Sequence, residues 1–338
     1  MTASVAPSGS LNLAPPNPAP PPVVIPEGRA WLAEQLVPED WTIPLSDAVL
    51  SEIETLRQAI REQPLPLVLR KPGEFEAPQL ADLMKRAKAI LDEGCGFCVL
   101  DRLPISDEAV DEWVACFWVL SQWIGRTVAQ KWDGTMLYEV TDTGKPFGYG
   151  VRGSHTNVEL VFHTDNAFGV QVPEYVGLLC RNPAPEGGVS RFCSLYSVHN
   201  RMVEQHPGLL ERLHRPMLFD RQKEHAPDAP RTAWAPFFVW NGKRLMARAN
   251  VMLVRKGYEV AELPLDPELS DALDAVEVLA NAPELWVEVP LERGQVQFLN
   301  NHELGHYRSQ FTDSSDPRLK RHLYRTWHRE SGARTYDG

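Results

Sequence analysis

The sequence predicts a mostly β protein with flanking helices, built on an antiparallel double-sheet jelly roll. Helical periodicity dominates before Gly125, whereas short apolar runs separated by turn residues dominate after it. These runs do not alternate regularly with helices, which disfavours a doubly wound parallel sheet. We expect residues 29–338 to form one domain, with a helical part at 46–125 and the jelly-roll core at about 126–330.

The N-terminal segment has an unusual composition. The first 26 residues carry eight prolines and almost no charge. Such a segment buries too little apolar surface to offset the entropy that it loses on ordering. We therefore expect residues 1–28 to be a flexible tail without a catalytic role.

Three helices are expected in the first half of the chain. Apolar residues recur at helical spacing over 46–62 and 78–93, which predicts two amphipathic helices. A third helix is expected over 106–125. It would begin at a Ser106 cap and carry acidic residues in its first turn, where the helix dipole favours them.

The β-rich part begins after Gly125. Asn241-Gly242 indicates a hairpin, because both central positions of its tight turn need positive φ. Strands are also expected at the short apolar runs 175–180, 236–240 and 296–299.

Helices interrupt these strands twice. One is expected over about 196–214 with a break near Pro207, since proline removes a backbone donor from a helix interior. The other starts at an Asp266 cap with Pro267 in the first helical position. Strands resume at Trp286.

Composition excludes several classes of function. A net charge of −11 disfavours nucleic-acid binding, which depends on basic residues that neutralise phosphates. The chain has neither a secretory signal nor an apolar run long enough for a membrane span, so we expect a cytoplasmic protein that binds a small molecule. Its oligomeric state stays unknown. The five cysteines look like reduced core residues, and we assign no chemistry to the Cys95–Cys98 pair.

A candidate metal site carries the functional signal. His163 and Asp165 end an apolar strand, where alternate side chains point to the same side and can reach one metal. His306 supplies a second imidazole far downstream, with His302 as its rival. Two imidazoles and one carboxylate suit Fe(II) with an open face, although zinc would also accept this set. Without the downstream histidine, a structural His–Asp contact would be the simpler interpretation.

Over about residues 97–329 the sequence resembles the taurine dioxygenase and clavaminate synthase-like family of Fe(II)- and 2-oxoglutarate-dependent oxygenases. The matching features are His163-Thr164-Asp165, Gly187-Gly188-Val189-Ser190, Asn300-Asn301, His306-Tyr307-Arg308, Phe311, Arg321 and Arg325. The resemblance implies a double-stranded β-helix core. It also implies Fe(II) held by His163, Asp165 and His306, with 2-oxoglutarate and O2 as co-substrates.

The resemblance assigns two residues to 2-oxoglutarate. Arg321 matches the arginine that binds the distal carboxylate, and a guanidinium fork suits a carboxylate because it stays charged when desolvated. Ser190 matches a hydroxyl that hydrogen-bonds the co-substrate, where the family more often has threonine. A zinc hydrolase would leave these features unexplained, as would a jelly-roll protein that binds metal without turnover.

The substrate is less well defined. Arg325 would share a strand face with Arg321 and is the best candidate to bind a substrate carboxylate, unless it only supports Arg321. Tyr138, Asn157 and Glu159 are candidate substrate contacts by position. The expected reaction is hydroxylation of a small carboxylate- or amino-acid-like molecule, with 2-oxoglutarate decarboxylated to succinate and CO2. Desaturation or cyclisation is the alternative, whereas the retained Asp165 argues against halogenation.

Overall fold

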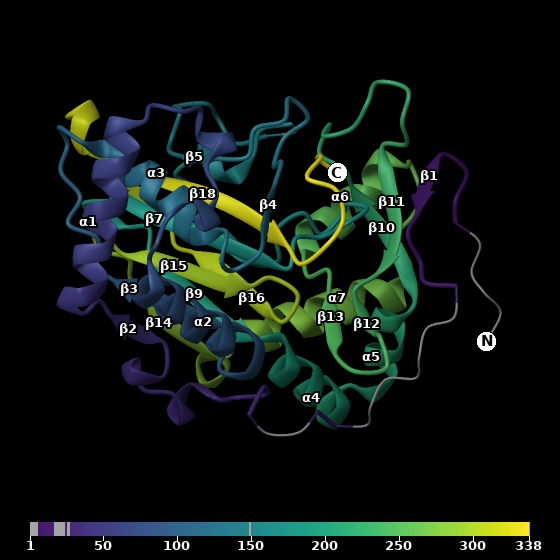
Figure 1. Cartoon of the computed structure of the whole chain (residues 1–338). Coiled ribbons are helices and arrows are strands. Elements are labelled where there is room, and N and C mark those ends of the chain that lie inside the picture. The colour runs from purple at the N-terminus through teal and green to yellow at the C-terminus, as the bar shows by residue number, and fades with distance from the viewer. Residues whose placement is uncertain (1–5, 17–23, 26–27, 149, 338) are drawn as a thin grey trace.

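The computed structural model describes residues 6–16, 24–25, 28–148 and 150–337. Two β-sheets form its centre, which confirms the jelly-roll class (Figure 1). The major sheet contains, in spatial order, β2 (Thr42–Pro44), β3 (Phe97–Asp101), β15 (Val296–Asn300), β7 (Tyr175–Asn182), β18 (His322–Arg329) and β4 (Arg126–Val128), with β5 (Tyr138–Val140) also paired to β18. The minor sheet contains β14 (Trp286–Val289), β9 (Ser190–Ser194), β16 (Leu304–Arg308) and β6 (Leu160–His163).

Three N-terminal helices cover the outer face of the major sheet: α1 (Asp47–Glu62), α2 (Pro78–Glu93) and α3 (Val110–Ser121). The first two match the predicted bounds, and Ser46 caps α1 by accepting a hydrogen bond from the backbone N–H of Val49. The third begins later than expected, with Ala109 at its N-cap, so the predicted Ser106 cap is wrong.

Strand alternation explains why the major sheet is buried on both faces. Cys98 and Phe298 point toward the helices, whereas Phe97 and Leu299 pack with Phe192 of the minor sheet. Period-two alternation sends successive side chains to opposite faces, so the strands are apolar almost throughout. The helical part is thus not separate from the β core, since its strand β3 lies inside the major sheet.

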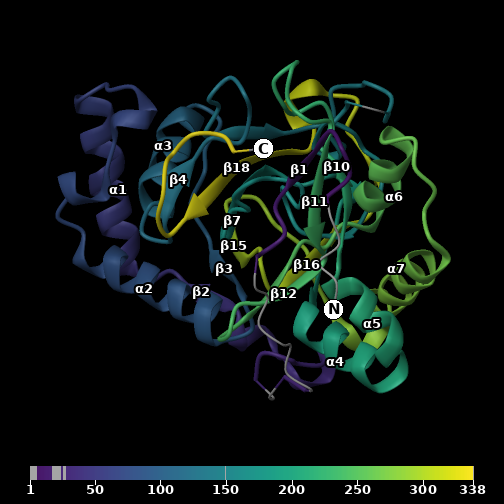
Figure 2. The ribbon, with the colours of Figure 1, turned by 90° about the vertical axis from the view of Figure 1, so that its right-hand side faces the viewer.

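Residues 195–285 form a large insertion between β9 and β14, which are neighbours in the minor sheet. Figure 2 shows its helices on the side of the molecule away from α1 and α2. The break at Pro207 and the Asp266 cap are confirmed, whereas α6 was not expected. The elements are α4 (Leu195–Gln205), α5 (Pro207–His214), β10 (Pro216–Asp220), β11 (Thr232–Pro236), β12 (Phe238–Trp240), β13 (Leu245–Ala247), α6 (Val251–Val260) and α7 (Pro267–Ala280).

The predicted hairpin is present, because β12 and β13 pair antiparallel. Its turn differs from the expectation. Gly242 has a φ of +91°, whereas Asn241 does not adopt positive φ. The backbone N–H of Asn241 donates to the carbonyl of Arg244 at 3.1 Å, so the turn is centred on Gly242 and Lys243 rather than on Asn241 and Gly242.

The N-terminal segment differs from the predicted flexible tail. Strand β1 (Ser10–Asn12) pairs parallel with β11. Ile25 is 4% exposed, and its backbone N–H donates to Oδ1 of Asn200 at 2.8 Å. A composition averaged over the whole segment does not reveal such isolated apolar anchors. Residues 1–5, 17–23 and 26–27 lie outside the described residues, and the rest of the tail prediction falls on them.

The remaining general predictions concern cysteines and membranes. All five cysteines are buried and free, and burial raises the pKa of the Cys95 thiol to about 11. That thiol is therefore not poised as a thiolate. Within the described part of the chain, every helix is too short or too polar to cross a bilayer.

Candidate metal centre

The two predicted histidine ligands lie opposite each other on neighbouring strands of the minor sheet. His163 ends β6, His306 lies in the middle of β16, and the antiparallel register pairs them with ring centroids 4.2 Å apart. Oδ1 of Asp165 lies 3.7 Å from Nε2 of His163 and 3.6 Å from Nε2 of His306. One potential ligand atom from each residue lies within 4.8 Å of the other two.

The histidine environments fit metal binding. Nδ1 of His163 lies 2.8 Å from the carbonyl oxygen of Val161, which leaves Nε2 on the side of Asp165. Burial, together with the adjacent His163, lowers the pKa of His306 to about 4. The ring is therefore neutral near pH 7, as a metal ligand must be.

Two side chains from β18 hold the Asp165 carboxylate by its second oxygen. Nε1 of Trp327 donates to Oδ2 at 2.8 Å, and Nη1 of Arg325 lies 3.0 Å from the same atom. Burial alone would raise the pKa of Asp165, but Arg325 and the hydrogen bonds with both histidines hold it well below its usual value. The charged carboxylate thus directs Oδ1 toward the two histidines, where a metal could bind all three residues.

His302, the rival for the third ligand, lies outside this group. Its Nε2 contacts the carbonyl oxygen of Val172 at 3.3 Å, and it lines a different cavity. The backbone explains the choice between the two histidines, because His306 is in strand β16 beside β6 whereas His302 precedes that strand.

An inner cavity runs from the three metal-site residues to Arg321, between the two sheets. Ser190, at the start of β9, also lines it. Arg321 is 5% exposed, and its Nη1 has no hydrogen-bond partner among the described residues. Burial lowers the pKa of Arg321 to about 10, which leaves it charged at neutral pH. A buried charged donor without a partner fits an anionic ligand.

The Gly-Gly turn before Ser190 lies against this arginine. Gly188 has a φ of +66°, and a Cβ there would approach Nε of Arg321 to 3.0 Å. Asp313 holds the backbone of the same arginine, because its Oδ1 accepts a hydrogen bond from the N–H of Arg321 at 2.7 Å. The turn therefore leaves room for the guanidinium.

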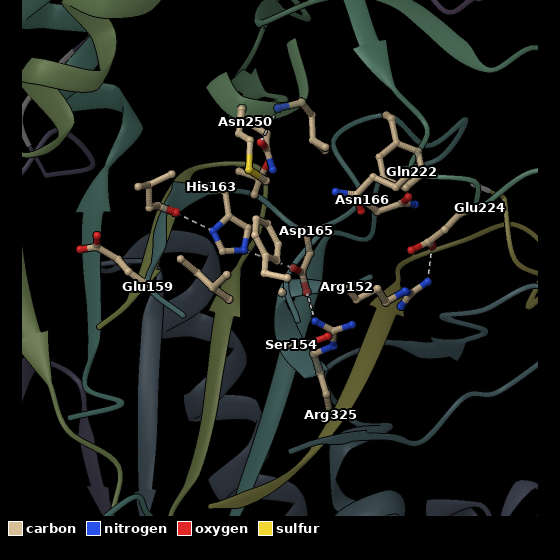
Figure 3. Close-up of a pocket in the computed structure, with 18 of the residues that line it drawn as sticks. Arg152, Ser154, Glu159, His163, Asp165, Asn166, Gln222, Glu224, Asn250 and Arg325 are labelled. Atoms are coloured by element: carbon tan, nitrogen blue, oxygen red, sulfur yellow. Dashed lines mark hydrogen bonds and ion pairs between the residues drawn. The ribbon is translucent and has the colours of Figure 1, made fainter. Parts of the chain in front are cut away.

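An outer cavity lies on the other side of His163 and Asp165 (Figure 3). Its wall combines apolar residues such as Phe147, Phe168 and Met252 with polar and charged residues, namely Arg152, Ser154, Glu159, Asn166, Gln222, Glu224, Asn250 and Arg325. Arg152 forms an ion pair with Glu224, and the hydroxyl of Tyr307 donates to Glu159.

The insertion supplies one wall of this outer cavity. Gln222, Asn250 and Met252 all come from residues 195–285. The insertion is tied directly to the metal-site loop, because the backbone N–H of Thr164 donates to the carbonyl of Ala249 at 2.7 Å. Sequence change in the insertion can therefore alter this cavity without altering the jelly-roll sheets.

The four predicted substrate contacts have different positions. Glu159 and Arg325 line the outer cavity, although Arg325 is already paired with Asp165. The structure does not bring Tyr138 or Asn157 to the wall of either cavity. The Tyr138 hydroxyl lies 2.7 Å from Nε2 of His155, and its ring lies under Arg325 because β5 pairs with β18. Asn157 donates to the carbonyl of Phe311 at 3.3 Å.

Several residues of the site were missed from the sequence. Trp327 carried a signal, because it lies two residues beyond Arg325 on the same strand face. Gln297 carried another, as a polar residue within the apolar run of β15. Arg152 and Asn166 had no comparable local signal.

The chain also resembles proteins of known class. It matches the family described as taurine catabolism dioxygenase TauD, TfdA family over residues 52–327. It is 27% identical over 300 residues to FR-33289 synthase of Streptomyces rubellomurinus (strain ATCC 31215), covering 85% of this chain and 84% of that protein. It is 26% identical over 309 residues to the taurine hydroxylase-like protein SAT17 of Stachybotrys chartarum (strain CBS 109288 / IBT 7711), covering 88% and 77%.

Solved structures share the fold at lower identity. An asparagine oxygenase with Fe(II), 2S,3S-3-hydroxyasparagine and succinate superposes with a TM-score of 0.68 at 18% identity, covering 86% of this chain and 94% of that one. The non-haem iron oxygenase OrfP with Fe and alpha-ketoglutaric acid gives 0.62 at 15%, with the same coverage. The chain belongs to the taurine catabolism dioxygenase TauD, TfdA family, whose members are non-haem iron dioxygenases that use Fe(II), 2-oxoglutarate and O2.

Proposed function

We propose that this protein hydroxylates an unactivated C–H bond of a small amino-acid-like or other carboxylate substrate. One observation carries the proposal. Three potential iron ligands stand between two cavities: one ends at Arg321, whose buried Nη1 has no hydrogen-bond partner among the described residues, and the other is lined by charged, polar and apolar residues. When bound, Fe(II) and 2-oxoglutarate supply the oxidising chemistry, in which O2 is consumed and 2-oxoglutarate is decarboxylated to succinate and CO2.

We assign the metal to His163, Asp165 and His306, and 2-oxoglutarate to the inner cavity. Arg321 binds the distal carboxylate there, and Ser190 donates a hydroxyl hydrogen bond. The unpaired Nη1 of Arg321 supports this assignment, because a buried guanidinium needs an anion to offset its desolvation. Asp165 keeps a carboxylate at the position that a halogenating enzyme would leave open for chloride.

We assign the substrate to the outer cavity. Its charged lining residues include Arg152, Arg325 and Glu159, so it can accept a zwitterion. The asparagine oxygenase holds hydroxyasparagine, and OrfP has been solved with a hydroxylated arginine, which supports an amino-acid-like substrate. Arg325 reaches the substrate only with those donors that its ion pair with Asp165 leaves free.

The experiment follows co-substrate binding and turnover separately. Anaerobic protein with Fe(II) should develop a visible charge-transfer absorption when 2-oxoglutarate is added, and admission of O2 should yield succinate. Arg321→Ala should weaken 2-oxoglutarate binding about 100-fold, since it removes a buried charged partner. Arg318→Ala is the matched control, because that nearby arginine is exposed and pairs only with Asp316. A protein that binds iron but forms no succinate would contradict the proposal.

A further inference from the structure

We infer that Gln297 is a co-substrate-binding residue whose side-chain amide donates a hydrogen bond to an oxygen of 2-oxoglutarate. This inference rests on the proposed function and adds a neutral donor to the two residues assigned to 2-oxoglutarate there. Gln297 lies in β15, between β3 and β7 in the major sheet. It lines the inner cavity together with Arg321 and Ser190.

The position of Gln297 in its strand is unusual. Val296 and Phe298 pack against the N-terminal helices, so Gln297 and Leu299 point the other way, toward the minor sheet. Gln297 is 1% exposed. It is thus a polar residue, fully buried, at an inward position that packing alone would fill with an aliphatic side chain.

The amide nitrogen of Gln297 lacks a partner. Its Nε2 is buried without a hydrogen bond to any described residue. Leaving a buried donor unsatisfied is unfavourable, and buried polar groups are nearly always paired in native proteins. Arg321 Nη1 is a second unsatisfied donor in the same cavity. A ligand rich in acceptor oxygens would satisfy both.

The charge of the cavity identifies the class of that ligand. Arg308, Arg321 and Arg325 line it, whereas Asp165 is the one carboxylate among its lining residues. Both carboxylate oxygens of Asp165 already face partners, one the two histidines and the other Arg325 and Trp327. The cavity therefore favours an anion with acceptors at both ends, which describes a dicarboxylate.

The strand register relates Gln297 to Arg325, the arginine that contacts Asp165. Gln297 and Arg325 both pair with Leu178 of β7, so they lie at one level across three strands. Arg325 contacts Asp165 at this level, whereas Arg321 lies before the start of β18. A dicarboxylate that spans this cavity from the metal-site residues to Arg321 lies along a wall to which Gln297 contributes.

The test is an anaerobic titration of the Fe(II)-loaded full-length protein with 2-oxoglutarate, followed by the charge-transfer absorption. Gln297→Leu removes the donor at similar volume, and we expect it to raise the apparent Kd about 10-fold, as for the loss of a hydrogen bond to a charged group. Gln297→Glu should weaken binding further, because it sets a carboxylate against the anion. Gln297→Met replaces the leucine variant if that one does not fold.

Gln295→Leu is the matched control. Gln295 lies just before β15, and its side chain is bonded to Asp101 and to the backbone of Glu292. Its substitution should leave the Kd unchanged. Fe(II) content and the thermal midpoint should match the wild type in every variant compared.

The two hypotheses fail in different ways. An unchanged Kd in the Leu and Glu variants, with a normal absorption band in the wild type, would overturn the role of Gln297 alone. A variant that loses Fe(II) while 2-oxoglutarate affinity per bound iron is kept would overturn it as well, because Gln297 would then be structural. The absence of the band in iron-loaded wild-type protein would instead overturn the proposed function.

Discussion

At the scale of single residues, the site depends on groups that orient the metal-site residues. Trp327 and Arg325 both contact Oδ2 of Asp165, so Oδ1 alone faces the two histidines. Such partners of a metal ligand fix its orientation and tune its basicity. The sequence pattern His-x-Asp indicates two of the candidate ligands. It does not indicate Arg325 and Trp327, which contact the carboxylate from a strand more than a hundred residues away.

Trp327→Phe should lower Fe(II) affinity about 10-fold, because it removes the indole donor from Oδ2 while keeping an aromatic side chain. Anaerobic metal titration measures this directly. Trp286→Phe is the control, since the Trp286 indole donates to the carbonyl of Asn281, away from the site. Equal Fe(II) affinities for the two variants would show that Trp327 does not support the ligand.

Gly188→Ala should weaken 2-oxoglutarate binding about 10-fold, because the new Cβ meets Arg321 Nε at 3.0 Å and displaces the guanidinium. Gly134→Ala provides the comparison. Gly134 also has positive φ, but a Cβ there meets nothing within 4 Å, so it adds backbone strain without the clash. The ratio of the two Kd values for 2-oxoglutarate isolates the effect of the contact.

At the scale of elements, the sequence predicted those features that depend on residues close together along the chain. The helices α1, α2 and α7 were predicted because helical periodicity and, for α7, the Asp266 cap are local signals. The candidate metal ligands were predicted because two of them, His163 and Asp165, are close in sequence. The outer cavity was not, since α6 and the loop before it approach His163 only through tertiary packing. Strand β1 was missed for the same reason.

In helix α6, a tertiary contact with β10 restricts which residue fits at one position. Gly257 interrupts its helical pattern, and a Cβ there would lie 2.8 Å from the backbone carbon of Leu218 in β10. We expect Gly257→Ala to lower the free energy of unfolding by about 1–3 kcal/mol through overpacking, despite alanine's higher helix propensity. Urea denaturation measures the change.

Gly208→Ala in α5 is the control for that substitution. A Cβ at Gly208 meets nothing within 4 Å, so the variant should be neutral or more stable by up to about 1 kcal/mol. A destabilisation equal to that of Gly257→Ala would contradict the close helix–strand contact as the cause.

At the scale of the whole molecule, the two sheets carry the metal-site residues while the insertion between β9 and β14 carries much of the outer wall. This division places the metal-site residues and much of the outer cavity wall on different segments of one chain. We expect an exchange of the 250–253 segment to change which substrate stimulates succinate formation. Fe(II) and 2-oxoglutarate affinities should stay the same, since Asn250, Met252 and Leu253 line the outer cavity and no residue of the segment lines the inner one.

Buried histidines away from the metal site make the whole fold sensitive to acid. Burial lowers the pKa to about 4 in each of four: His199, His214, His302 and His328. Unfolded histidine has a pKa near 6.5, so the unfolded chain binds more protons between these values. The stability that these neutral rings contribute is therefore complete above about pH 6.5 and is lost as the pH falls toward 4.

We expect the urea midpoint of the metal-free protein to fall between pH 7 and pH 5, with each histidine accounting for on the order of 1–2 kcal/mol at pH 5. Carboxylates titrate mostly below this window. His328→Gln should reduce the slope, because glutamine can keep contacts to Thr326 and the Gly125 carbonyl without binding a proton. A midpoint that stays constant from pH 7 to pH 5 would mean that these rings are protonated in the folded protein at little cost.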